Sequence, residues 1–141
     1  HTAHCDYLLT HLDKPRSIQS EQAVWIIDHP PSPAPSLSLS GNIVAIVCSH
    51  DQKGLQLAAQ CGVPAITCGL SPWDTVTLSS ITTDSAQICL QRSVTSLSGQ
   101  VIDPTEFPVR LSGHLSQEHL LLLCAALILC DQTLLLHNPI L

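Results

Sequence analysis

Two histidine–aspartate pairs are the residues of this sequence with the clearest capacity for chemistry. His11 and Asp13 occur together in "THLDK", and an imidazole close to a carboxylate can hold a divalent metal or polarise a substrate. His50 and Asp51 follow the apolar run at 42–49, where α/β proteins place their ligands. Each pair also has an ordinary structural explanation, a solvated loop for the first and a helix cap beside a surface histidine for the second. We take His11 as a candidate metal ligand.

Polar residues lead into the longest apolar run of the sequence, in "SGHLSQEHLLLLCAALIL" (112–129). Ser116 is the expected N-cap of a helix, and Glu118 falls in its first turn, where a carboxylate complements the helix dipole. Eleven consecutive apolar residues run from Leu120 to Cys130, well short of the ~20 that span a bilayer. The pattern predicts a buried helix from Ser116 to Asp131, and no membrane span.

Several catalytic and phosphate-binding motifs are missing from the printed sequence. It has no G-x-S-x-G elbow, and none of its six glycines belongs to G-x-x-x-x-G-K-[ST] or G-x-G-x-x-G. The seven cysteines include no C-x-x-C pair, and most of them lie in apolar runs, where a reduced thiol serves as a small core residue. This usage of cysteine predicts a reducing, cytoplasmic location.

Composition predicts one globular domain over residues 1–141. Hydrophobic residues make up 45% and charged residues only 11%, which argues against disorder from excess charge. Five basic residues face eleven acidic ones, for a formal charge of −6, and the basic residues are scattered along the chain. Because a phosphate backbone is bound by clustered Lys and Arg, nucleic acid is not an expected partner.

Hydrophobic periodicity predicts an α/β fold, with a partial parallel sheet, flanking helices and a small antiparallel β extension. The expected helices cover 17–27, where Trp25 has helical spacing, 52–61 with Asp51 as N-cap and Gly62 as the stop, and 116–131. The proline-rich stretch 29–41 is expected to be a surface connection. The expected strands are 4–12, 42–49, 63–69, 75–81 and 86–92, followed by strands in "GQVID" and "EFPVRLSG".

The order and spacing of these segments resemble the second half of the central domain of the Mur ligases, ATP-dependent enzymes that add amino acids to the peptidoglycan precursor. The resemblance runs from about Leu8 to Asp131. Where the family has "DHLD" and a lysine about fourteen residues later, this chain has "THLDKPRSIQSEQAVW". The family's "NADDP", "ITFGL" and "LPGRHNxxNALAA" stretches correspond to "VCSHDQ", "ITCGL" and "LSGHLSQEHLLLLCAA".

This resemblance implies a set of site residues. His11 would hold a metal, and Gly113, Ser116 and His119 would lie beside the adenine. The chain departs from the family at several of these positions. Trp25 stands where the lysine is expected, and Ser116 and His119 replace two asparagines. An Asn side chain offers a base edge both a donor and an acceptor, whereas a Ser hydroxyl and an imidazole present different geometries.

The resemblance therefore implies a degenerate or truncated Mur ligase-like domain that is non-catalytic as given and needs no cofactor of its own. Its role would be structural or binding, alongside another protein or the rest of a longer chain in cell-wall precursor synthesis. The alternative is one part of an active amide-forming ligase with its phosphate loop upstream, which would use ATP and Mg²⁺. A minor alternative is the Mur-ligase-like subunit of a lipid II amidotransferase, whose usual four-Cys zinc ribbon is missing here. A soluble α/β domain with no nucleotide link is the last possibility.

Overall fold

A six-stranded mixed sheet frames the protein in the computed structural model, which describes residues 16–32 and 36–137. The first four strands of this sheet run parallel to one another, and the pairing from the fourth strand to the sixth is antiparallel. In spatial order the strands are β1 (Ser17–Ile27), β2 (Ser38–Cys48), β3 (Ala65–Cys68), β4 (Val76–Ile81), β5 (Ser85–Leu90) and β8 (Thr105–Arg110). The expected α/β class, with parallel and antiparallel parts, is confirmed at this level.

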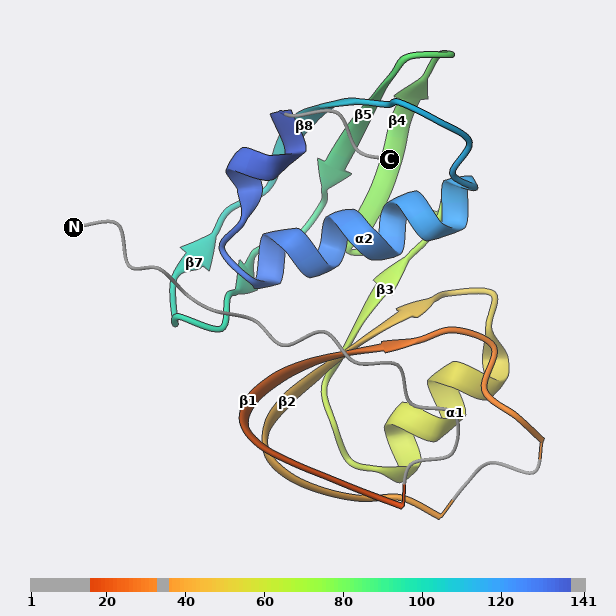
Figure 1. Ribbon diagram of the computed structural model, residues 1–141, viewed down its shortest axis with the longest axis vertical. Helices are drawn as coiled ribbons and strands as arrows, with labels where there is room; N and C mark the ends of the chain where they lie inside the picture. Colours follow the sequence, from red (N-terminus) through yellow and green to blue (C-terminus); the bar gives the residue numbers. More distant parts are fainter. Residues whose placement is uncertain (1–15, 33–35, 138–141) are drawn as a thin grey trace.

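The remaining elements flank this sheet. They are the helices α1 (Gln52–Gln60) and α2 (Gln117–Leu129), the 3₁₀ helix η1 (Thr133–His137), and a two-stranded antiparallel sheet of β6 (Val94–Thr95) and β7 (Val101–Ile102). In Figure 1, α1 lies beside β1 and β2 in the lower half of the molecule, and α2 runs across the upper half next to β3 and β4. The expected strands at 63–69, 75–81 and 86–92 are each confirmed to within two residues.

Strand β2 is covered on both faces, which explains its unbroken apolar sequence. Ile46 and Cys48 belong to the large core cluster that includes α2, whereas Ala45 and Val47 belong to a smaller cluster with Leu57 and Ala58 of α1. Successive side chains of a strand point to opposite faces, so both faces of β2 need apolar residues. The β2–α1–β3 segment is a βαβ unit, with strand, helix and strand in the order expected for 42–49, 52–61 and 63–69.

The predicted helix over residues 17–27 is wrong, because this segment is β1 and pairs in parallel with β2 from Ser17 to Ile27. Its apolar end alternates as a strand does. Trp25 and Ile27 pack against the α1 cluster, and Val24 packs against the α2 cluster. Ile18, Gln22, Trp25 and Ile26 also fit a helical spacing, but pairing with β2 and packing on both faces decide in favour of the strand.

The predicted surface connection at 29–41 is wrong in its last four residues, because β2 already begins at Ser38. The register between β1 and β2 shifts between Gln19 and Gln22, opposite Gly41. Gly41 has a φ of +107°, and a Cβ built there would lie 1.5 Å from the carbonyl oxygen of Ser20. Only glycine suits this close approach of the two strands.

The predicted helix beginning after Ser116 is confirmed as α2, which ends at Leu129. The Ser116 hydroxyl accepts a hydrogen bond from the backbone N–H of His119 at 3.1 Å, as the N-cap role requires.

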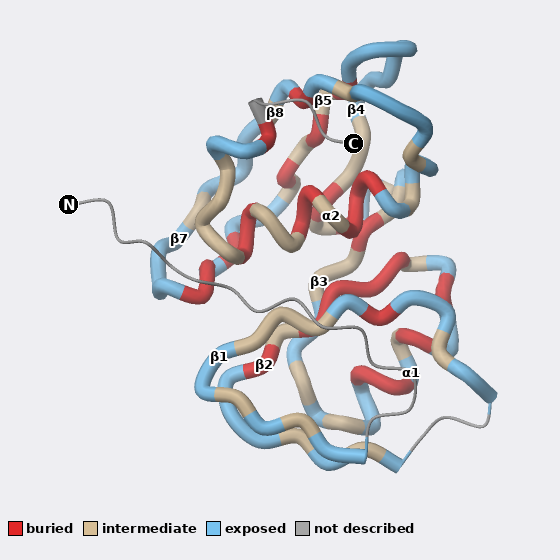
Figure 2. The backbone as a smooth tube through the Cα atoms, in the orientation of Figure 1, coloured by how far each residue is buried: buried red, intermediate tan, exposed pale blue. Residues whose placement is uncertain are grey.

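Figure 2 shows buried residues along both helices and the centre of the sheet, whereas the tip of the β4–β5 hairpin is exposed. Among residues 16–32 and 36–137, no helix has the length and apolar character to cross a bilayer.

Candidate functional site

Polar side chains from three segments that are distant in sequence meet at one edge of the sheet. Asp28 and His29 follow β1, and His50 follows β2, so both groups lie at the carboxyl ends of parallel strands. Glu118 and His119, in the first turn of α2, lie close to them. The carboxyl edge of a parallel sheet is where open α/β proteins bind their ligands, so this cluster is the candidate functional site.

Asp51 fixes the backbone around the site. One of its carboxylate oxygens accepts the N–H of Gly54 at 2.9 Å, which makes Asp51 the N-cap of α1, as predicted. The other oxygen accepts the backbone N–H of His29 at 3.0 Å. These two hydrogen bonds join the loop after β1 to the start of α1, and the Asp51 side chain that accepts them is buried.

His29 adopts a left-handed backbone conformation, with a φ of 46°. Its side chain is exposed and lies among three carboxylates. The Nδ1 atom is 3.9 Å from an oxygen of Asp51, and the Nε2 atom is 3.7 Å from Asp28 and 3.5 Å from Glu118. The backbone conformation and the hydrogen bond that the N–H of His29 donates to Asp51 thus direct this imidazole toward the start of α2.

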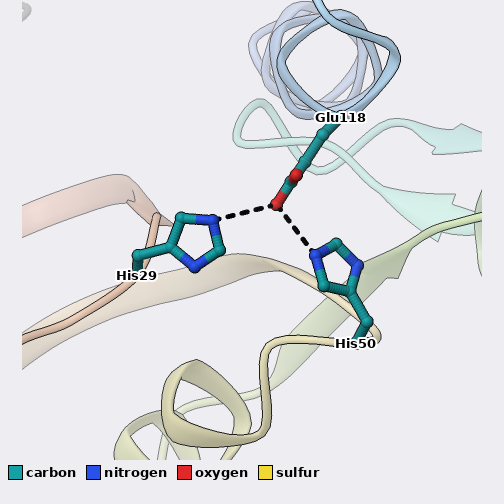
Figure 3. Close-up of side chains that lie close together, drawn as sticks. All are labelled: His29, His50 and Glu118. Atoms are coloured by element: carbon teal, nitrogen blue, oxygen red, sulfur yellow. Dashed lines mark ion pairs between the residues drawn. The ribbon is translucent and has the colours of Figure 1, made fainter.

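Glu118 is at the centre of the cluster. Its Oε1 atom is 3.2 Å from Nε2 of His50 and 3.5 Å from Nε2 of His29, so both rings face the same oxygen (Figure 3). Ligand atoms of all three residues lie within 4.8 Å of one another. The side chains of His29 and His50 are 65% and 63% exposed, and that of Glu118 is 28% exposed. The group is therefore open to solvent on the histidine side.

A shallow depression adjoins this cluster. Its volume is about 580 Å³, and it is lined by residues 29–32 and 50–53, including Lys53.

Cys48 lies nearby, at the end of β2. Burial raises the pKa of its thiol to about 12, and the charge of Glu118 acts in the same direction. A thiol with a raised pKa carries little thiolate at neutral pH, which is the opposite of the lowered pKa typical of a cysteine nucleophile.

The structure places the predicted adenine-site residues at the start of α2, and it gives each a local explanation. Gly113 has a φ of 131°, a conformation that favours glycine. The Ser116 hydroxyl caps the helix, and Nε2 of His119 is 3.2 Å from an oxygen of Asp28. The predicted metal ligand His11 lies outside the described residues. Trp25 is in a strand and offers no donor atom to a metal, so the family's lysine-and-metal arrangement does not fit this position.

Sequence reasoning missed three members of the cluster, Asp28, His29 and Glu118. The first two directly follow β1. Because a helix is predicted there, the sequence does not indicate that "DH" lies after a strand whose neighbour is followed by "SHD".

Comparison with known protein families, curated proteins and solved structures finds no match for this chain. The site is therefore interpreted from its own chemistry.

Proposed function

We propose that this chain is a non-catalytic, Mur ligase-like binding domain with a structural or binding role in cell-wall precursor synthesis. The observation that carries the proposal is the meeting of two segments on which the resemblance depends. The strand-end stretch "VCSHDQ" (47–52) and the helix-start stretch "LSGHLSQEH" (111–119) are almost sixty residues apart in the sequence. They approach to 3.2 Å, between His50 and Glu118, at the carboxyl edge of the sheet.

The chemistry of this edge supports a role other than phosphoryl transfer. Helix N-termini bind phosphates through free backbone N–H groups. One of these N–H groups is already engaged at each helix, because Gly54 donates to Asp51 at α1 and His119 donates to Ser116 at α2. The nearby side chains include three carboxylates, and Lys53 is the one basic residue among those lining the depression. This arrangement disfavours a triphosphate.

Thermal melting with and without Mg-ATP tests the proposal. We expect millimolar Mg-ATP to leave the melting temperature unchanged and the protein to consume no ATP. A nucleotide present at a hundred times its dissociation constant adds about 2.7 kcal/mol to the free energy of unfolding, so real binding gives a clear upward shift. Such a shift contradicts the proposal and favours the alternative, one part of an active amide-forming ligase. Adenosine is the matched control, because it carries the same base without the phosphate charge.

A further inference from the structure

We propose that His29, His50 and Glu118 form a binding site for a transition-metal dication of the zinc class. This inference goes beyond the proposed function and does not depend on it, since it rests on the geometry of the cluster alone. The site also differs from the one implied by the Mur ligase resemblance, which involves His11 and Mg²⁺.

The donor set selects the class of ion. Two imidazole nitrogens and one carboxylate oxygen form a ligand set typical of open zinc sites, in which water or a substrate takes the fourth position. Imidazole suits Zn²⁺, Ni²⁺ and Cu²⁺, whereas Mg²⁺ and Ca²⁺ prefer ligand sets made of oxygen atoms. The depression of about 580 Å³ borders the two histidines, so a fourth ligand can reach the ion from solvent.

The spacing of the donor atoms also fits. Zinc–nitrogen and zinc–oxygen bonds of 2.0–2.2 Å in a tetrahedron place neighbouring donors about 3.3–3.6 Å apart. The carboxylate oxygen of Glu118 lies 3.2 Å from Nε2 of His50 and 3.5 Å from Nε2 of His29. All three donors lie within 4.8 Å of one another, and side-chain rotation of the two exposed imidazoles can close the remaining gap. Figure 3 shows both rings turned toward the same carboxylate oxygen.

The surrounding charges favour a cation. Asp51 lies 3.9 Å from Nδ1 of His29, on the opposite side of the ring from the proposed metal position. A carboxylate on this side of the ring is a common partner of a metal-bound histidine, and a shift of about 1 Å would bring Asp51 within hydrogen-bond distance of Nδ1. Asp28 adds a further carboxylate, 3.7 Å from Nε2 of the same ring. Lys53 is the one cationic residue among those lining the adjoining depression.

The test is a titration of the full 141-residue chain with Zn²⁺ in competition with a chromophoric chelator, repeated with Co²⁺ as a spectroscopic substitute. We expect one ion per chain with micromolar or tighter affinity, and the visible absorption of Co²⁺ bound by nitrogen and oxygen. His29→Gln, His50→Gln and Glu118→Gln should each weaken binding at least about tenfold. Mg²⁺ at millimolar concentration should not compete.

Two matched controls separate this site from others on the chain. His114→Gln removes an exposed histidine near the start of α2 that is not in the cluster, and His11→Gln removes the histidine that the resemblance implies. Both should leave Zn²⁺ affinity unchanged. The proposal is overturned if the wild type does not bind Zn²⁺, or if the three cluster variants bind it as tightly as the wild type. Melting in the presence of a chelator shows whether each variant is folded. Because the Mg-ATP experiment contains no Zn²⁺, the two proposals fail or stand separately.

Discussion

Asp51 is the residue on which the geometry of the candidate site depends most directly, so Asp51→Ala is the most informative stability variant. Its two carboxylate oxygens accept hydrogen bonds from two segments, the N–H of Gly54 at 2.9 Å and the N–H of His29 at 3.0 Å. Alanine removes both acceptors at once. The variant therefore loses the cap of α1 and releases the loop that carries the first imidazole.

The expected cost follows from these two contacts. Replacing an N-cap aspartate by alanine costs about 1 kcal/mol. Losing the second hydrogen bond costs about another 1 kcal/mol, because the N–H of His29 is partly buried. The ion pair between Asp51 and the exposed imidazole adds little. An unfolding entropy of about 2.1 cal/mol/K per residue gives about 0.3 kcal/mol/K for this chain, so a loss of about 2 kcal/mol lowers the melting temperature by about 7 °C.

The assay is thermal and urea unfolding of the wild type, Asp51→Ala and Asp51→Asn. Asparagine keeps one acceptor oxygen and presents an amide group to the other N–H, so it should fall about midway between the other two proteins. Asp103→Ala is the surface control, because that carboxylate accepts a hydrogen bond from Ser93 at an exposed position. The reasoning is refuted if Asp51→Ala unfolds within about 0.5 kcal/mol of the wild type, or if Asp51→Asn is the less stable of the two variants.

Three further predictions concern the fold, each measured by unfolding. Leu136→Ala should cost about 2–5 kcal/mol because this side chain is fully buried, whereas Leu134→Ala, at a 79% exposed position, should cost less than about 0.5 kcal/mol. Gly41→Ala should cost more than about 3 kcal/mol because its Cβ meets backbone at 1.5 Å, whereas Gly62→Ala, with a φ of +68° and open space, should cost about 1 kcal/mol. Burial raises the pKa of the Cys124 thiol from 9.0 to about 12, so the folded state binds that proton more tightly than the unfolded state does. The contribution of the protonated thiol to the free energy of unfolding is fully present below pH 9. It falls by about 1.4 kcal/mol per pH unit as the pH rises toward 12, so Cys124→Ala should lose stability less steeply over this range.

The parts of the fold that the sequence predicts are those in which local pattern and tertiary burial agree. The run "NIVAIVC" has the β-branched, unbroken apolar character of a strand covered on both faces, and it is one. Ser116 and Asp51 are standard N-caps, and both caps are observed. The Mur ligase resemblance remains a prediction, because it depends on order and spacing that this α/β arrangement neither requires nor excludes.

The failure at β1 has a physical cause. Its first half, Ser17–Gln22, is polar apart from Ile18 and largely exposed, so it carries no clear hydrophobic period. Only the final residues alternate between the α1 and α2 clusters, and a run of five residues fits a helix or a strand equally well. Parallel pairing with β2 decides the conformation, and pairing between distant segments is not written in local periodicity. The same error hid the site, because a helix at 17–27 would not bring Asp28 and His29 to the end of a strand.

The backbone at His29 links the stability of the fold to the proposed metal site. A non-glycine residue with positive φ costs about 1 kcal/mol or more, although histidine tolerates the left-handed region better than most residues. Glycine would meet the backbone requirement at lower cost, but it would remove the imidazole that lies 3.5 Å from Glu118. The hydrogen bond from its N–H to Asp51 offsets part of this cost and holds the ring at the carboxyl edge of the sheet. Backbone strain at a position whose side chain completes a set of metal donors agrees with a binding role, since strained residues concentrate at binding sites.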